Sequence, residues 1–558
     1  MRGCATAAQA ISGGRASLGV EFGSTRVKAC LIGPGFEVLA TGAHEWQNEL
    51  VDGRWSYPLD AVWSGLQAAY SELADEAQQR HGVRPATLSG IGISAMMHGY
   101  LAFDGDGELL VPFRTWRNTS TGPAAAELSD AFGFNIPLRW SIAHLYQAVL
   151  DGESHVGQLA SLTTLAGFVH RKLTGRSVLG VGDASGMFPI DPETGDYDER
   201  MLAAADELIG RRMPGASVRG LLPEVLSAGA DAGRLTDEGA KLLDLSGTLE
   251  PGIRFAPPEG DAGTGMVATN SVARRTGNVS VGTSVFAMVV LERALSAVHE
   301  EIDVVATPDG LPVAMVHCNN GASELGAWAS VFREFAVALS GGHDVPPDHV
   351  FSTLITAALD GAADGGGLLS YNFLSGEPVA GVDSGRPLVV RTSNSRLTLA
   401  NFMRTQLYGV FATLSLGMRV LESEHVAVDQ MFAHGGLFRT PVVAQRLLAT
   451  ALGAPVAVGD TAAEGGAWGA AVLAAYLEHA SDQSLAAYLA ERVFASAELT
   501  VEQPDDTDAA GFAAYLERFR AGLAIEHVAA DALSNGDGGA DSEDVTTPTP
   551  TTTTVRTA

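Results

Sequence analysis

An aspartate set among small residues is the clearest candidate for chemistry in this sequence. Asp261 stands in "APPEGDAGTGMVATN", after a Pro-Pro-Glu-Gly turn and directly before Ala262, Gly263 and Gly265. Small neighbours let a ligand approach the backbone closely. A carboxylate in such a place can accept the proton of an attacking hydroxyl, as phosphoryl transfer to an alcohol requires. From spacing alone a turn-forming role is favoured, and nearby Glu259 is expected to be a solvated loop acid.

Two glycine-hydroxyl turns could bind phosphate. One lies in "SLGVEFGSTRVKACLIG" and the other in "GNVSVGTSVFAMVVLE", each at the end of a strand-like segment. Backbone N–H groups at such a turn form an anion-binding nest. One such turn alone is usually a plain hairpin, but two facing each other would hold the phosphates of a nucleotide. The candidate residues are Gly23, Ser24, Thr25, Lys28, Gly282, Thr283 and Ser284.

The first of these segments carries a single acid. Glu21 interrupts the apolar run from Leu18 to Phe22, one residue before the turn begins. It is either a strand acid that faces solvent or a carboxylate that faces the turn and helps hold a metal ion, and the residues alone leave both open.

The elements that must position these residues occur twice in the same order. The first half predicts a hairpin at 18–33, a third strand at 36–46, a helix near 58–80 and a strand at 88–99. The second half predicts a hairpin at 277–292, a helix near 398–424 and a strand before a glycine turn at 428–438. Both helices carry apolar residues at steps of three and four. We therefore expect a duplicated α/β domain with a cleft between the copies.

The composition limits the classes of partner that this protein can bind. The chain has 558 residues, 46% of them hydrophobic, and a formal net charge of -30. So negative a protein is repelled by nucleic acid and by anionic membrane surfaces, which favours a small-molecule ligand. No apolar stretch is long enough to span a bilayer. Three cysteines far apart in sequence, Cys4, Cys30 and Cys318, favour a reducing, cytoplasmic setting.

The two ends of the chain differ from its middle. The first 16 residues have too little hydrophobic centre for a signal peptide, and the end of the chain is rich in Thr, Pro, Asp and Gly. Both are expected to be disordered. The expected division is a leader at 1–16, a first domain at 17–265, a second at 266–480, a helical extension at 481–529 and a tail at 530–558.

Several motifs together resemble the FGGY family of carbohydrate kinases, members of the actin, hexokinase and Hsp70 superfamily. "VEFGSTRVK" resembles the family's first phosphate motif and "SVGTS" its second. "FAHGGLFRTP", with Gly435 and Gly436, resembles the glycine-rich adenosine stretch, and "AEGGAWGAAVLAAY", with Glu464 and Gly469, the closing helix. The resemblance implies two actin-like, ribonuclease-H-like domains with an ATP and sugar cleft between them.

The resemblance also implies roles for two acids at the site of phosphoryl transfer. Asp261 matches the family's catalytic base. Glu21 takes the place of an aspartate that helps hold Mg²⁺ near the phosphates of ATP, although the family's residue there is one methylene shorter.

On the sugar side, "SAMMHG" resembles the motif of the xylulokinase branch, in which the residues matched by Met97 and His98 contact the sugar. "FRTWRNTS" aligns Trp116 with a pocket tryptophan, with Asn118 where an acid is common and Ser120 where arginine is common. The missing arginine favours a neutral ketose over an aldonate. Asp183 and Ser185, in "GDASGMFPID", are expected to be structural.

Together these features predict an ATP- and Mg²⁺-dependent kinase of a ketose, with a pentulose such as xylulose as the expected substrate. A related aldonate or polyol kinase, or a non-catalytic actin- or Hsp70-like nucleotide-binding sugar sensor, stays open. Family habit implies a homodimer.

Overall fold

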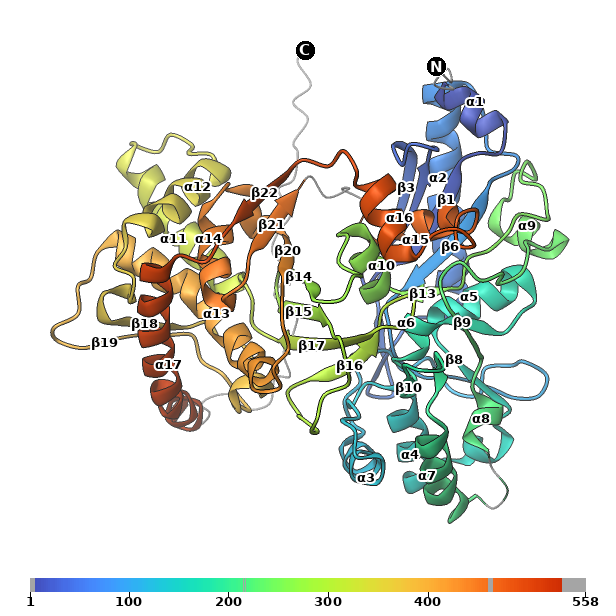
Figure 1. The fold of residues 1–558 in the computed structure, drawn as a ribbon, viewed down its shortest axis with the longest axis horizontal. Coiled ribbons are helices and arrows are strands. Elements are labelled where there is room, and N and C mark those ends of the chain that lie inside the picture. Colours follow the sequence, from blue (N-terminus) through green and yellow to red (C-terminus); the bar gives the residue numbers. More distant parts are fainter. Residues whose placement is uncertain (1–5, 214, 216, 460–464, 534–558) are drawn as a thin grey trace.

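The computed structural model describes residues 6–213, 215, 217–459 and 465–533, which form two lobes (Figure 1). The first lobe is built on a five-stranded sheet in the order β13-β6-β1-β2-β3. Its strands are β1 (Ser17–Phe22), β2 (Arg26–Ile32), β3 (Val38–Glu45), β6 (Gly90–Ala95) and β13 (Glu259–Gly260). Strand β1 is antiparallel to β2 and parallel to β6.

The second lobe repeats this arrangement within a seven-stranded sheet in the order β16-β17-β15-β14-β20-β21-β22. The strands are β14 (Thr276–Val281), β15 (Val285–Val290), β16 (Asp303–Ala306), β17 (Pro312–Cys318), β20 (Gln430–His434), β21 (Val456–Gly459) and β22 (Leu499–Glu502). Strand β14 is antiparallel to β15 and parallel to β20, as β1 is to β2 and β6. The predicted duplication of an α/β domain is therefore confirmed, strand by strand.

Helices cover these sheets. The predicted helices are α2 (Leu59–His81) and α13 (Leu399–Ser423). Helix α2 lies against β3 where Gly42 has no side chain: a Cβ there would come within 2.0 Å of the Ala69 carbonyl oxygen. The other helices of seven or more residues are α3 (Gly122–Phe132), α4 (Ser141–Asp151), α5 (Leu165–Thr174), α7 (Glu199–Gly210), α9 (Asp237–Leu243), α10 (Asp261–Ala268), α11 (Ser323–Leu339), α12 (Pro347–Ala357), α14 (Val443–Leu452), α15 (Gly465–Tyr476) and α17 (Asp506–Leu533).

Smaller elements complete the lobes. The short helices are α1 (Ala7–Ser12), α6 (Val181–Ala184), α8 (Val218–Leu221) and α16 (Leu485–Tyr488). The short strands are β4 (Glu49–Val51), β5 (Arg54–Ser56), β7 (Leu101–Phe103), β8 (Ser161–Thr163), β9 (Val178–Gly180), β10 (Ile190–Asp191), β11 (Asp196–Tyr197), β12 (Glu224–Leu226), β18 (Leu368–Tyr371) and β19 (Leu388–Arg391).

Helix α15 crosses back from the second half of the chain to the sheet of the first lobe. It lies on β1 and β6, where Gly19 and Gly92 let the backbones touch: a Cβ at Gly19 would meet the Ala467 carbonyl oxygen at 2.0 Å, and one at Gly92 the Ala470 oxygen at 2.1 Å. Gly469 brings the same helix against the backbone of Thr264 in α10. The stretch expected to belong to the second domain thus covers the first lobe, as Figure 1 shows.

The ends of the described chain are helical. The expectation of a disordered leader at 1–16 is wrong from residue 7 onward: α1 has a Thr6–Gln9 capping box and buries Ala10 and Ile11. The expected tail lies outside the described residues from 534 onward.

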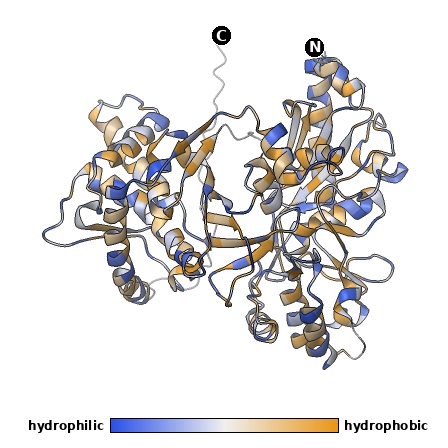
Figure 2. Ribbon diagram, viewed as in Figure 1, coloured by the Kyte–Doolittle hydropathy of each residue, from blue (hydrophilic) through white to orange (hydrophobic). Residues whose placement is uncertain are grey.

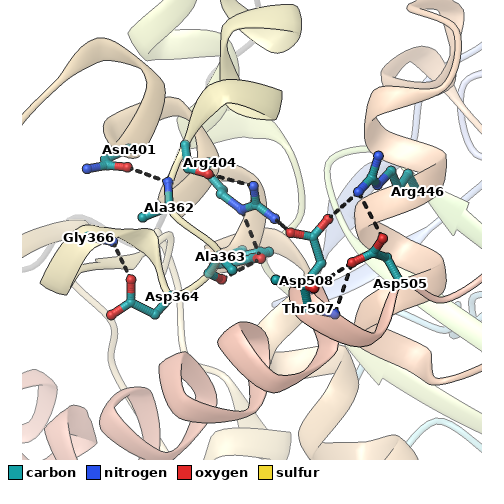
Figure 3. Close-up of polar contacts among 12 residues, drawn as sticks. Ala362, Ala363, Asp364, Gly366, Asn401, Arg404, Arg446, Asp505, Thr507 and Asp508 are labelled. Carbon is teal, nitrogen blue, oxygen red and sulfur yellow. Dashed lines mark hydrogen bonds and ion pairs between the residues drawn. The ribbon is translucent and has the colours of Figure 1, made fainter.

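Helix α17 is fixed to the second lobe by a network of charged side chains (Figure 3). Arg404 of α13, which is 3% exposed, pairs with Asp508 of α17. Arg446 of α14 pairs with Asp508 at 3.0 Å and with Asp505 at 3.2 Å. Because α13 lies across the core of this lobe, the network anchors the helical extension to it.

Hydrophobic residues are concentrated on the strands, while the helices carry both hydrophobic and hydrophilic residues (Figure 2). Within the described ranges, none of the helices has the length and apolar character needed to cross a membrane.

Candidate active site

A cleft of about 1730 Å³ lies between the lobes. It collects predicted residues from segments far apart in sequence. Those that line it are Glu21, Ser24, Met97, His98, Trp116, Asp261, Thr283, Ser284 and Gly435. Gly23, Thr25, Lys28, Gly282 and Gly436 belong to the same turns and strands but do not themselves line the cleft.

Asp261 lies on the floor of the cleft as the first residue of α10. Its Oδ1 accepts hydrogen bonds from the backbone N–H groups of Met97, at 3.2 Å, and Ala262, at 3.0 Å. The carboxyl is open to the cleft, yet the surrounding protein removes enough water to raise its pKa above the ordinary value of an aspartate, against the opposing effect of those hydrogen bonds. A carboxylate with a raised pKa is a better proton acceptor.

The first hairpin turn is held from behind by two stacked aromatic rings. Trp46 and Tyr57 stack with ring centres 4.3 Å apart. Trp46 donates from Nε1 to the carbonyl oxygen of Gly23 at 2.7 Å, and the Tyr57 hydroxyl donates to that of Ser24 at 2.7 Å. With these carbonyls bound on one side, the tip keeps its shape and its hydroxyls stay exposed.

The second hairpin turn is held by backbone bonds. Gly321 donates to the Thr283 carbonyl oxygen at 2.6 Å, and Ala322 donates to that of Gly282 at 2.8 Å. Gly435, with φ of 120°, lies beside the same hairpin, where a Cβ would come within 2.2 Å of the Val281 carbonyl oxygen. Only glycine fits this position, because it meets both the backbone angle and the close approach.

Glu21 faces the cleft rather than bulk solvent. Its carboxylate lies against Gly466 in the first turn of α15, where a Cβ would approach Oε1 to 2.5 Å. A helix N-terminus favours a negative charge. Lys28 is the direct cross-strand neighbour of Glu21, so the two side chains leave the sheet on the same face. Glu464 lies outside the described residues.

Met97 and His98 form one wall of the cleft at the end of β6. His98 has φ of 69° and is 5% exposed, with its Nδ1 3.2 Å from the Gly186 carbonyl oxygen. Burial, followed by the charge of Arg139, lowers the pKa of His98 well below its ordinary value. The ring is therefore neutral at physiological pH. Because a carbonyl oxygen only accepts, Nδ1 carries the proton and Nε2 is left as an acceptor.

Trp116 stands at the rim, 37% exposed, with its neighbour Arg117 6.0 Å over its ring and 4.5 Å over that of Trp55. Trp55 and Arg117 also line the cleft. The rim is thus an aromatic and cationic surface that the sequence pattern identified only in part.

Asn118, predicted to bind substrate, is not among the residues that line the cleft. It accepts from the Trp55 N–H at 2.9 Å and donates to the carbonyl oxygens of Trp55 at 2.8 Å and Thr115 at 3.1 Å. Its side chain is therefore engaged in holding β5.

The cleft does contain arginine, although not at the position of Ser120. Arg139, just before α4, lines it and pairs with Asp303 of β16. No motif marks Arg139 in the sequence, since its place in the cleft depends on how two lobes meet.

A pair of buried acids lies next to the floor of the cleft. Glu259, expected to be a solvated loop acid, is 1% exposed and accepts from the N–H groups of Gly182 at 3.4 Å and Asp183 at 3.0 Å. Asp183 is fully buried and accepts from the Thr164 hydroxyl at 2.6 Å. Burial raises the pKa of Asp183 to about 7 and, together with the Asp183 charge, that of Glu259 well above its ordinary value. Glu259 thereby ties α6 to the segment that carries Asp261.

Comparison with known proteins gives these features a context. Residues 277–478 match the C-terminal domain of the FGGY family of carbohydrate kinases. A xylulose kinase of Klebsiella pneumoniae is 24% identical over 437 residues, which cover 75% of this chain and 81% of that protein.

Solved structures show the same fold at low identity. The xylulose kinase of Rhodospirillum rubrum superposes with a TM-score of 0.75 at 20% identity, covering 93% of this chain and 100% of that one. A gluconate kinase of Lactobacillus acidophilus gives 0.73 at 16%, covering 93% and 99%. A glycerol kinase of Plasmodium falciparum, solved with ADP, gives 0.67 at 14%, covering 91% and 97%.

Two duplicated α/β lobes around a cleft with two hairpin turns are also the fold of the xylulose kinase and glycerol kinase structures, which belong to the actin-like ATPase superfamily. Residues 277–478 of this chain form a C-terminal domain of the FGGY family of carbohydrate kinases, whose members are phosphotransferases acting on alcohol groups.

Proposed function

We propose that this protein transfers the γ-phosphoryl group of ATP to a hydroxyl of a ketose, with a pentulose such as xylulose as the substrate. The observation that carries the proposal is the position of Asp261, which lines the cleft together with Met97, His98 and residues of both hairpin turns. A base, a polar sugar wall and two phosphate-binding turns around one cavity are the parts that this transfer needs.

In this scheme Asp261 accepts the proton of the sugar hydroxyl as that oxygen attacks the γ-phosphorus. The N–H groups of Met97 and Ala262 hold its carboxylate in place. The exposed tips at Ser24 and at Thr283 and Ser284 bind phosphate oxygens from the two lobes, and Gly435 and Gly436 lie against the adenosine. Nε2 of His98 accepts a hydrogen bond from a sugar hydroxyl.

The cleft also suits the magnesium ion that accompanies ATP. Mg²⁺ prefers oxygen ligands and keeps several waters, so a carboxylate with phosphates nearby suffices. Among the described residues no cluster of three or more metal-binding side chains occurs. Glu21 would therefore hold the ion through water while the phosphates supply other ligands. Bound there, Mg²⁺ neutralises charge on the transferred group.

An aldonate is the second candidate, because Arg139 and Arg117 both line the cleft and arginine binds carboxylates well. A coupled assay of ADP release, run on the purified protein with pentuloses, hexuloses, polyols and aldonates, separates these possibilities. Sugar-stimulated ADP release is expected, greatest with a pentulose. A protein that binds ATP and sugar but releases no ADP with any of them would be a sensor and not a kinase.

A further inference from the structure

One ion pair in the cleft joins the two lobes. Arg139 precedes α4 in the first lobe, and Asp303 is the first residue of β16 in the second. The two side chains are only 22% and 13% exposed. Both also line the cleft. Their charged groups are therefore partly shielded from bulk water and still within reach of a ligand.

Both partners are held by residues of the first lobe. The Arg139 carbonyl oxygen accepts from the Gly99 N–H at 3.3 Å, which ties it to the residue after His98. Asn135 donates from Nδ2 to the Ile302 carbonyl oxygen at 3.0 Å and to Asp303 Oδ1 at 3.4 Å. The pair is thus held in a fixed position next to Met97 and His98.

Arg139 carries the positive charge at this pair, because the neighbouring histidine is neutral. His317 of β17 also lines the cleft, but burial and the charge of Arg139 lower its pKa to about 4, so it is neutral. The positive charge of Arg139 also acts to lower the pKa of His98 and that of Asp261. A carboxylate ligand would be drawn to this arginine unless Asp303 already occupied it.

We propose that Arg139 and Asp303 determine substrate choice: together they bind neighbouring hydroxyls of the sugar chain, and Asp303 shields Arg139 from substrates that carry a carboxylate. An aspartate accepts two hydroxyl protons while an arginine donates to the same oxygens, which suits a vicinal diol. A carboxylate would instead meet the like charge of Asp303. This inference rests on the proposed function and specifies its substrate class as neutral ketoses.

The test is Asp303→Asn, which keeps the size of the side chain and removes its charge. We expect kcat/KM for xylulose to fall about tenfold and the ratio of xylonate to xylulose kcat/KM to rise about tenfold or more, the scale of one charge-assisted hydrogen bond. Dissociation constants for both compounds, measured by calorimetry, give the same ratio without turnover. Asp344→Asn is the matched control, because Asp344 forms an exposed pair with Arg333 outside the cleft.

Two further variants keep the test decisive. In Arg139→Gln/Asp303→Asn the gain toward xylonate should disappear, because the freed guanidinium is gone. Arg139→Gln alone should weaken xylulose binding about tenfold, which gives a readout even if Asp303→Asn folds poorly. An unchanged xylonate-to-xylulose ratio in folded Asp303→Asn, or no effect of Arg139→Gln on xylulose binding, overturns the inference. Binding without ADP release in the unmodified protein would contradict the proposed function alone.

Discussion

The backbone N–H of Met97 donates a hydrogen bond of 3.2 Å to Oδ1 of Asp261, across 164 positions of sequence. One bond therefore links the end of β6 to the candidate base. Because the acceptor is the carboxylate of Asp261, the bond also restrains the rotamer of that side chain relative to the backbone of Met97.

Replacement of Asp261 by Asn should lower kcat by on the order of 10² or more and leave ATP affinity nearly unchanged, because the amide cannot accept the proton. Steady-state kinetics with ATP binding measured by calorimetry checks both parts. Near-normal turnover in a folded variant would remove Asp261 from the role of base.

Replacement of His98 by Ala should raise the sugar KM about tenfold or more, since a sugar hydroxyl loses its acceptor at Nε2 in a closed site. Gly186→Ala is a companion variant: its Cβ would approach His98 Nδ1 to 2.7 Å and displace the ring without removing it. Both should affect the sugar KM. An effect confined to the ATP KM would place His98 outside sugar binding.

Glu21→Gln should raise the Mg²⁺ concentration needed for half-maximal rate, because an amide oxygen is a weaker ligand for a hard dication than a carboxylate. Glu45→Gln is the control, since Glu45 is an exposed acid on the neighbouring β3, paired with Arg26 at 2.7 Å. Superimposable Mg²⁺ titrations of Glu21→Gln and the unmodified protein would show that Glu21 has no part in metal binding.

Asp183→Asn should change how stability depends on pH. The pKa of Asp183 is about 7 in the folded protein, raised by burial from an ordinary 3.8. A raised carboxyl pKa means that its neutral form stabilises the fold at low pH and that this contribution is lost as pH rises through about 7. Relative to the unmodified protein, the variant should therefore gain on the order of 2 kcal/mol between pH 5 and pH 8.

Urea unfolding at the two pH values measures this difference. A constant offset between the two proteins would mean that Asp183 stays ionised in the fold. Asp429→Asn, which removes an exposed acid paired with Arg275, is the control variant.

The sequence predicts the elements whose signals are local. The hairpins β1–β2 and β14–β15 and the helices α2 and α13 follow from alternation and helical periodicity within single segments, and the structure confirms them. The duplication is visible for the same reason, because each copy repeats those local patterns in order.

What the sequence does not reveal depends on contacts between distant segments. Glu259 follows a Pro-Pro turn and so resembles a loop acid, but its burial comes from α6, some 76 positions away. Asn118 aligns with a pocket position, yet its amide bonds the backbone of β5. Arg139 lies in the cleft paired with Asp303, which β16 of the other lobe supplies. Each of these outcomes is decided by packing, which a linear pattern does not encode.

The path of the chain through α15 has a consequence for dissecting the protein. After β21 the chain returns to the first lobe as α15 and α16, and then rejoins the second sheet as β22. A fragment ending near residue 265 would lack the helix that covers Gly19 and Gly92 and would leave an apolar sheet face in water. The first lobe thus depends for its packing on a helix from the second half of the chain. The described connections from α10 to β14 and from α16 to β22 both run between the lobes, so any opening of the cleft must bend the two together.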